Sequence, residues 1–178
     1  MDNGLIPRRY AKALYKFALE NGEAKRIYEL SKRVIEAFKA NPDLQKVLSN
    51  PFIGEEDKEK LLATSAGQED DIFNKFVKLI ISQKRVEYAR EMMLAYRDIY
   101  RKENHISQAK ITTAVKLDDA RMEKLRELVK NAFKDSQLEF SEAVDPALIG
   151  GFLIDVDSVR MDASLSNELE QLRQTLLS

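Results

Sequence analysis

Apolar residues in the first half of the chain recur at every third or fourth position, which is the spacing of one face of an α-helix. From Leu5 to about Ala109 this spacing is interrupted only by short segments containing Asn, Pro or Gly. Because such segments commonly end or begin helices, the pattern predicts a bundle of six helices. The first helix is expected at about residues 7–21, and the second ends near Asn41. Asn41 would cap the third helix, at about 42–49. The other three helices are expected at about 55–65, 69–83 and 86–102.

Two of these helices carry more apolar surface than a bundle needs. In the helix at about 69–83 the apolar positions cover an arc of about 200°, whereas a stripe of about 100° is enough to face a core. One half of that arc contains Phe73, Val77 and Ile80, and the other half contains Ile72, Phe76 and Leu79. The first helix divides in the same way, with Ala11, Leu14 and Ala18 against Tyr10, Ala13 and Phe17.

The excess apolar surface has two interpretations. Both helices can lie centrally and be covered on all sides by their neighbours. Alternatively, the second half of each arc borders an exposed groove that takes an amphipathic helix from a partner protein. The candidate groove residues are Tyr10, Ala13, Phe17, Ile72, Phe76 and Leu79.

Around His105 the period changes from helical spacing to alternation, which is typical of a half-buried strand. The alternating apolar positions are Ala109, Ile111, Thr113, Val115 and Leu117. We therefore predict two domains, residues 1–105 and 106–178. Asp118 follows as the expected cap of a helix whose buried positions would be Met122, Leu125, Val129 and Phe133.

The most distinctive stretch runs from Val144 to Ser164. Pro146 restricts the backbone and Gly150-Gly151 permits angles that other residues resist, so a sharp bend should lead into a strand. After the turn at residues 157–158 a second short extended run continues through Met161, and Ser164 can cap a last helix. That helix has leucines on one stripe, Leu165, Leu169, Leu172 and Leu176. The fold is thus predicted to be mostly α, a six-helix bundle followed by a small α/β domain ordered strand, helix, strand, strand, helix.

Composition narrows the possible functions. At 178 residues and 44% hydrophobic, the chain can bury the cores of two small domains. Its 29 Lys plus Arg and 30 Asp plus Glu nearly cancel, so no overall field attracts nucleic acid or an anionic membrane. The absence of cysteine excludes disulfides and thiolate metal sites, and no run approaches the ~20 apolar residues that span a bilayer. Direct membrane insertion is not expected.

The sequence offers no catalytic group. His105 is the only histidine, and nothing in the sequence signals positioned partners for it. Gly150-Gly151 lacks the Gly-Lys-Ser/Thr ending of a phosphate loop, and Asp155, Asp157 and Asp162 lack the glycine and distant glutamate of a calcium loop. We predict no catalytic, cofactor or metal site and no small-molecule substrate.

Three segments, in order, resemble one family. The segment Arg9-Tyr10-Ala11-Lys12-Ala13-Leu14-Tyr15 is similar to its first helix, and residues 79–86 with Arg85 are similar to its fifth helix and the following turn. The order Pro146, Gly150-Gly151, Asp162, Ser164 resembles its C-terminal signature. This family is the delta subunit of F-type ATP synthases, called the oligomycin-sensitivity-conferring protein in mitochondria.

The resemblance implies a non-catalytic stator subunit that couples rotation, and with it proton transport, to ATP synthesis. The helical domain would bind the catalytic head, with the N-terminal helix of an alpha subunit in the groove. The C-terminal domain would hold the b subunit of the peripheral stalk, with the last-helix leucines as contacts. Because the chain opens without a transit peptide, we expect a bacterial protein, peripheral on the cytoplasmic face of the inner membrane.

Alternatives remain at three points. The leucine stripe is also what a helix sealing its own domain shows. The segment Ser166-Asn167-Glu168 lacks the basic residue that often follows the family signature, and Met161 replaces the usual β-branched residue before Asp162. The alternative function is a helical RNA-binding adaptor, for which dispersed pairs such as Arg8-Arg9 and Lys84-Arg85 would have to share one basic face.

Overall fold

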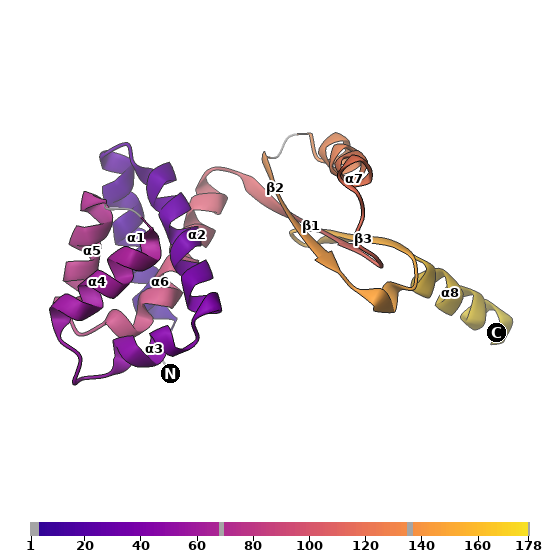
Figure 1. Cartoon of the computed structure of the whole chain (residues 1–178). Helices are drawn as coiled ribbons and strands as arrows, with labels where there is room; N and C mark the ends of the chain where they lie inside the picture. Colours follow the sequence, from indigo (N-terminus) through magenta and orange to yellow (C-terminus); the bar gives the residue numbers. More distant parts are fainter. Residues whose placement is uncertain (1–3, 68–69, 135–136, 178) are drawn as a thin grey trace. The chain divides into compact units, whose positions relative to one another are not determined.

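The computed structural model describes residues 4–67, 70–134 and 137–177 (Figure 1). The chain divides into two compact units, with the division in the sequence between Asn104 and His105. The first unit is helical, and the second contains a four-stranded sheet. The predicted fold class, mostly helical with a small strand-containing C-terminal part, is confirmed. Within the described ranges, no helix combines the length and the apolar character that crossing a membrane requires.

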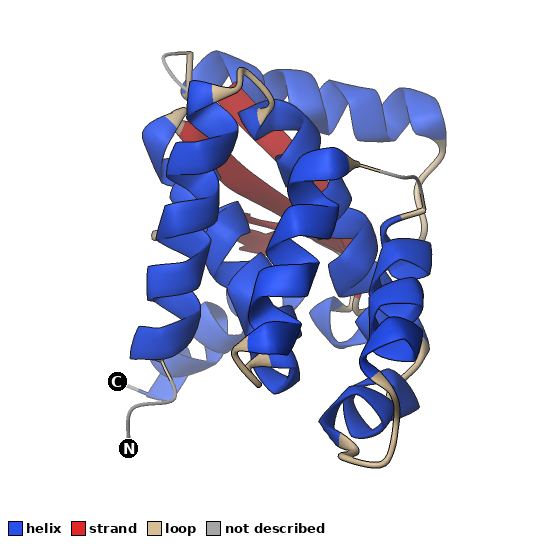
Figure 2. Cartoon of the chain, turned by 90° about the vertical axis from the view of Figure 1, so that its left-hand side faces the viewer, coloured by secondary structure: helices blue, strands red, loops and turns tan. Residues whose placement is uncertain are grey.

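The N-terminal unit is built from helices joined by short connections (Figures 1 and 2). They are α1 (Leu5–Glu20), α2 (Ala24–Ala40), α3 (Asp43–Ser49), α4 (Glu55–Ala66), α5 (Asp71–Ser82) and α6 (Ala89–Glu103), with a 3-10 turn, η1 (Val86–Tyr88), before α6. Helices α1 and α2 pack chiefly against α6, whereas α4 packs against α5 and α2. Helix α5 is therefore not the main packing partner of α1.

Buried positions in this unit follow the predicted helical spacing. They include Leu14, Ala18, Ile27, Leu30, Val34, Phe38, Phe73, Val77, Ile80, Met92 and Tyr96. The Tyr96 hydroxyl donates to the carbonyl oxygen of Ala24 at 3.0 Å, so this buried polar group is satisfied. Burial, with smaller contributions from Tyr15 and Tyr100, raises the pKa of Tyr96, which keeps the hydroxyl a neutral donor.

Asp70 fixes the start of α5. Its carboxylate accepts a hydrogen bond from the Phe73 N–H at 2.9 Å as the helix cap, and it also pairs with Arg26 Nε of α2 at 2.8 Å. The Asp70 side chain is only 4% exposed. One residue thus both caps α5 and ties it to α2, which sets the direction of the α5 side chains.

Two details of the helical unit differ from the prediction. Asn41 does not cap α3, because its side-chain amide donates to the Ala37 carbonyl at 3.4 Å and so closes α2, while Pro42 takes the cap position of α3. The last predicted helix begins as the 3-10 turn η1. Apolar spacing in this helix placed Ile99 on one face with Tyr88, Met92 and Tyr96, but Ile99 is only half-buried. The buried face of α6 consists of Ala89, Met92, Met93, Tyr96 and Tyr100.

The C-terminal unit is a four-stranded sheet with helices. Its elements are β1 (Ile106–Thr113), α7 (Asp119–Ala132), β2 (Gln137–Val144), the 3-10 turn η2 (Pro146–Leu148), β3 (Gly151–Val156), β4 (Val159–Ser164) and α8 (Leu165–Leu177). The strand order is β2-β1-β3-β4. Because β1 and β2 are parallel, α7 serves as the crossover between them, and the other pairs are antiparallel.

The two faces of the sheet differ in polarity. One face packs against α7 in a core of Ala109, Ile111, Met122, Val129, Ile154 and Val156. Asp118 caps α7 as predicted, accepting from the Arg121 N–H at 2.7 Å. On the other face Arg160 Nε pairs with Asp155 Oδ1 at 2.6 Å. This unit therefore has one small core, between the sheet and α7.

The predicted order of this unit was wrong by one strand. Three strands follow α7, because β2 and β3 are separated by η2 and by Ile149, which has a positive φ of 65°. The Pro146 ring and this turn prevent one continuous extended run. Val115, predicted to point inward, lies beyond the end of β1 and is 65% exposed.

Candidate functional site

The six residues predicted to border a groove line one cavity between α1 and α5. They are Tyr10, Ala13 and Phe17 of α1 and Ile72, Phe76 and Leu79 of α5, and Leu14 and Lys75 complete the lining. The cavity has a volume of about 210 Å³. Residues three and four apart share a helix face, so each helix presents one continuous row to the other.

The other half of each arc is buried, Ala11, Leu14 and Ala18 in α1 and Phe73, Val77 and Ile80 in α5. Ile72 and Phe76 form the floor of the groove, with 9% and 6% exposure. Phe17 and Leu79 remain 41% and 48% exposed at its sides. Within the described part of the N-terminal unit, the two helices are therefore not covered on all sides.

The groove is apolar with charge only at its edge. Lys75 is its one charged lining residue. One turn further, Lys78 Nζ pairs with Glu59 Oε1 of α4 at 3.4 Å, outside the lining. An apolar groove lined by side chains of two helices suits the apolar face of a third helix.

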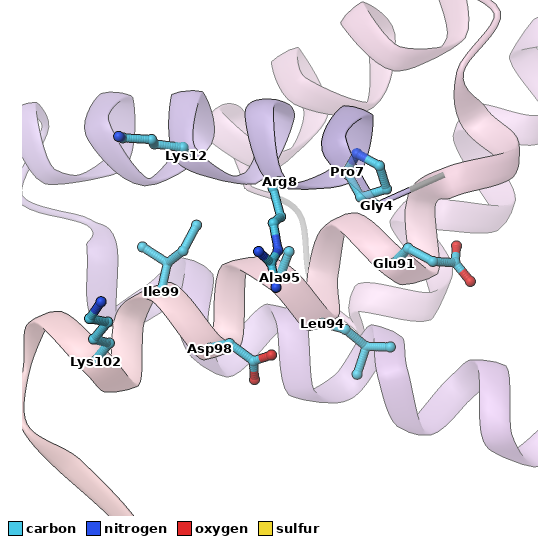
Figure 3. Close-up of a pocket in the computed structure, with 10 residues that line it drawn as sticks. All are labelled: Gly4, Pro7, Arg8, Lys12, Glu91, Leu94, Ala95, Asp98, Ile99 and Lys102. Carbon is cyan, nitrogen blue, oxygen red and sulfur yellow. The ribbon is translucent and has the colours of Figure 1, made fainter. Parts of the chain in front are cut away.

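A larger cavity lies between α1 and α6 (Figure 3). Its volume is about 600 Å³, and the helical spacing of the sequence did not indicate it. Arg8, Lys12 and Lys102 contribute positive charge and Glu91 and Asp98 negative charge. Figure 3 shows Arg8 extending from α1 toward α6 near Ala95. Because its charges nearly balance, this cavity favours no ligand of one sign.

The described residues show no arrangement for catalysis. Across 4–67, 70–134 and 137–177, no group of three or more His, Cys, Asp or Glu side chains could hold a metal ion. His105 begins the C-terminal unit with a φ of 52°. Burial raises the pKa of Tyr100, whose ring stacks on Tyr28 with centroids 4.3 Å apart. Packing therefore explains the raised pKa values of Tyr96 and Tyr100.

The predicted stalk-contact leucines lie along α8. Leu165 and Leu169 are 47% and 55% exposed, so they do not seal the core of their own unit. The side chains of Leu172 and Leu176 fall outside the described residues.

The signature residues have structural roles. A Cβ on Gly151, which has a φ of 75°, would lie 2.1 Å from the Ala163 backbone oxygen. A Cβ on Gly150 would lie 2.6 Å from Leu165 Cδ1, and Pro146 begins η2. The two glycines therefore allow the start of β3 to approach β4 and α8 closely.

Asp162 and Ser164 form the junction between β4 and α8. The Asp162 carboxylate accepts from the Ser164 hydroxyl at 2.6 Å and from its N–H at 3.0 Å. Ser164 Oγ in turn accepts from the Asn167 N–H at 3.2 Å, which confirms it as the cap of α8. These hydrogen bonds, the hydroxyl first, hold the pKa of Asp162 below its usual range.

Comparison with known proteins identifies the family. A family profile described as ATP synthase delta (OSCP) subunit matches residues 6–176. The chain belongs to this family. The delta subunit of Parabacteroides distasonis ATP synthase is 35% identical over 178 residues, covering 99% of this chain and 98% of the relative. The corresponding Bacteroides thetaiotaomicron subunit is 32% identical over 180 residues, covering 99% and 96%.

The fold agrees with this membership in the delta (OSCP) family. A chain in the cryo-EM structure of the Toxoplasma gondii mitochondrial ATP synthase hexamer is similar with a TM-score of 0.71, covering 97% of both chains at 19% identity. As a delta-family member, the chain is a structural, stator-coupling subunit of ATP synthase and not an enzyme. It is a membrane-associated, peripheral part of that complex. The RNA-binding alternative gains no support from these matches.

Proposed function

We propose that the helical unit, residues 1–105, binds the catalytic head of ATP synthase by holding the N-terminal helix of an alpha subunit in the α1–α5 groove. The observation that carries this proposal is the uncovered apolar trough, with Ile72 and Phe76 as its floor and Phe17 and Leu79 at its sides. Helices α1 to α6 of the described residues support the six-helix bundle as the scaffold of this groove.

The chemistry of the groove suits a joint that bears torque. Burying exposed apolar surface contributes about 25 cal/mol per Å². Exposed ion pairs contribute only about 0–1 kcal/mol and are screened by salt. A contact made mainly by apolar side chains therefore dissociates slowly and depends little on ionic strength, as a stator requires.

We assign residues 106–178 to the peripheral stalk, through its b subunit. The exposure of Leu165 and Leu169 on α8 supports them as contacts, and Leu172 and Leu176 continue the same stripe in the sequence. The chain would then join the head to the stalk and hold the head still while the rotor turns. The Bacteroides and Parabacteroides relatives favour a position on the cytoplasmic face of a bacterial inner membrane.

Calorimetric titration with a peptide from the N-terminus of the same organism's alpha subunit tests the groove. We expect saturable one-to-one binding by the full chain, weakened at least about tenfold by Ala13→Asp and by Leu79→Asp. Both positions are exposed, so these charges should leave the helical circular dichroism unchanged.

Leu19→Asp is the matched control, because Leu19 is a 57% exposed apolar residue of α1 outside the groove lining. It should bind the peptide as the unaltered chain does. Absence of binding by the well-folded chain, or equal weakening by all three changes, would refute the groove as the alpha-subunit site.

A further inference from the structure

The C-terminal unit has an apolar cavity of about 420 Å³ that the proposed contacts do not use. It lies beside α7, where β1 ends and β3 begins. Its apolar lining includes Val115, Leu125, Leu128, Ile149 and Phe152. We call it the Ile149 pocket. Three of these side chains are well exposed, Val115 at 65%, Leu128 at 46% and Ile149 at 64%.

Ile149 has an unusual backbone for its type. Its φ is 65° and its ψ is −42°, and the Gly150 N–H donates to the Leu148 carbonyl at 2.7 Å across it. This is a γ-turn of the strained, positive-φ kind, which a β-branched residue rarely adopts. Such strain persists only where surrounding contacts impose it, and it clusters at functional sites.

The contacts that impose this turn are numerous. The Ile149 N–H donates to the Pro146 carbonyl at 3.0 Å, and the Asp145 N–H donates to the Thr113 carbonyl of β1 at 2.9 Å. The Leu165 N–H of α8 donates to the Gly150 carbonyl at 3.1 Å. The turn is thus fixed to both β1 and α8. The turn leaves the Ile149 side chain 64% exposed and outside the core of the unit.

The charges that line the pocket are basic. Arg121 and Lys124 lie one turn apart on α7, both exposed, and are the charged members of the lining. Arg121 Nε forms an ion pair with Asp118 Oδ2 at 3.3 Å. Among the residues that the structure describes, Lys124 has no ion-pair partner. The pocket thus combines an apolar floor with positive charge on the α7 side.

We propose that the Ile149 pocket docks an amphipathic helix that carries acidic residues along one flank, contributed by the b subunit of the stalk. The apolar face of that helix would cover Leu128, Ile149 and Phe152, and its acidic flank would meet Arg121 and Lys124. The Leu165 N–H, at the first residue of α8, donates to the carbonyl of Gly150, which lines the pocket. The exposed Leu165 side chain therefore continues the same surface. This inference rests on the proposed stalk contact and gives it a second, pre-formed site with Ile149 as the anchor.

Titration of the full chain with a soluble C-terminal fragment of the same organism's b subunit tests the pocket. Ile149→Gly is the decisive variant, because glycine accepts the positive φ and so removes the side chain without loss of thermal stability. We expect it to weaken binding at least about tenfold. Lys124→Glu should weaken binding and reduce its dependence on salt. Val159→Thr, at a 57% exposed position outside the pocket, is the control and should bind normally.

The outcomes separate this inference from the stalk assignment itself. Binding that is weakened by Ile149→Gly and Lys124→Glu, but not by Val159→Thr, supports the pocket. A further variant, Leu169→Asp, alters a 55% exposed leucine of α8 outside the pocket lining. Binding that is lost in this variant alone overturns the pocket and leaves the α8 leucines as the stalk contact. No binding of the fragment by the well-folded chain overturns both.

Discussion

Gly151 begins β3 with a φ of 75°, and a Cβ on it would lie 2.1 Å from the Ala163 oxygen. That oxygen belongs to the backbone of the paired strand β4, so no side-chain rotation can relieve the clash. We expect Gly151→Ala to lower the free energy of unfolding of the C-terminal unit by about 2–4 kcal/mol. Amide hydrogen exchange of β3 and β4 measures the loss for this unit alone.

Gly22→Ala is the matched control for this change. Gly22 has nearly the same φ, 73°, but nothing lies within 4 Å of an added Cβ. We expect Gly22→Ala to lower the free energy of unfolding by about 1 kcal/mol, which is the cost of placing alanine in a left-handed backbone conformation. Similar losses in the two variants would contradict the role of close approach to β4.

Asp162 makes the C-terminal unit sensitive to acid. Its pKa is lowered in the folded state, first by the Ser164 hydroxyl and then by the Ser164 N–H. A lowered folded-state pKa stabilises the fold above the unfolded pKa, and this stabilisation disappears as pH falls through the folded-state pKa. We expect Asp162→Asn to flatten the stability profile below the ordinary aspartate pKa of about 3.9.

Denaturant midpoints followed from neutral to acid pH provide the measurement. Ser164→Ala removes the stronger donor but keeps the N–H, so its profile should fall between those of Asp162→Asn and the unaltered chain. If all three profiles have the same shape at low pH, the hydrogen bonds of Asp162 do not control the acid response.

Helix α5 shows how far the sequence pattern reaches. In the structure Phe73, Val77 and Ile80 face the core, whereas of the other half of the arc only Leu79 is well exposed, because Ile72 and Phe76 are 9% and 6% exposed. The width of the arc left two interpretations, a helix covered on all sides or a helix beside an exposed groove, since a bundle helix needs only one apolar stripe. The six candidate residues line one cavity because they lie on two regular helices, where spacing fixes direction.

Other features depend on contacts that spacing does not encode. The Asn41 side chain could cap either the end of α2 or the start of α3. It caps the end of α2, because its amide donates to the Ala37 carbonyl. Pro146 and Gly150-Gly151 predicted a sharp bend, but not its form as a γ-turn at Ile149, because hydrogen bonds to the distant Thr113 and Leu165 help to fix that form. The cavity between α1 and α6 is formed by half-buried side chains such as Ile99, which periodicity assigns to the core.

The cap of α5 is an element-level test. Asp70 accepts from the Phe73 N–H and pairs with Arg26, so Asp70→Ala removes both contacts. We expect a loss of about 1–3 kcal/mol in the free energy of unfolding of the helical unit. Asp70→Asn keeps a good capping side chain and should lose less, because Arg26 is half exposed and its charge is partly screened. Equal losses in chemical denaturation would show that the ion pair, and not the cap, holds α5.

At the scale of the whole molecule, each compact unit has its own core and its own uncovered apolar surface. In the helical unit this surface is the trough over Ile72 and Phe76, and in the C-terminal unit it is the Ile149 pocket with the start of α8. The first is formed by two helices, and the second by a helix, the ends of two strands and a hydrogen-bonded turn. Surfaces that are already ordered lose little conformational freedom on binding, which favours tight and lasting contacts. A subunit that joins two larger assemblies needs such a surface on each unit.

The last prediction concerns the assembled ATP synthase. If the helical unit holds the head, loosening the groove should let the head turn with the rotor, so ATP would still be hydrolysed but fewer protons would be pumped. We expect membranes carrying Leu79→Asp to keep ATP hydrolysis while ATP-driven proton pumping falls, and Leu19→Asp to keep both. Hydrolysis and pumping are measured on the same membranes, with the amount of bound head determined by immunoblot. Full pumping by Leu79→Asp would contradict the groove as the load-carrying contact, because catalysis itself does not involve this chain.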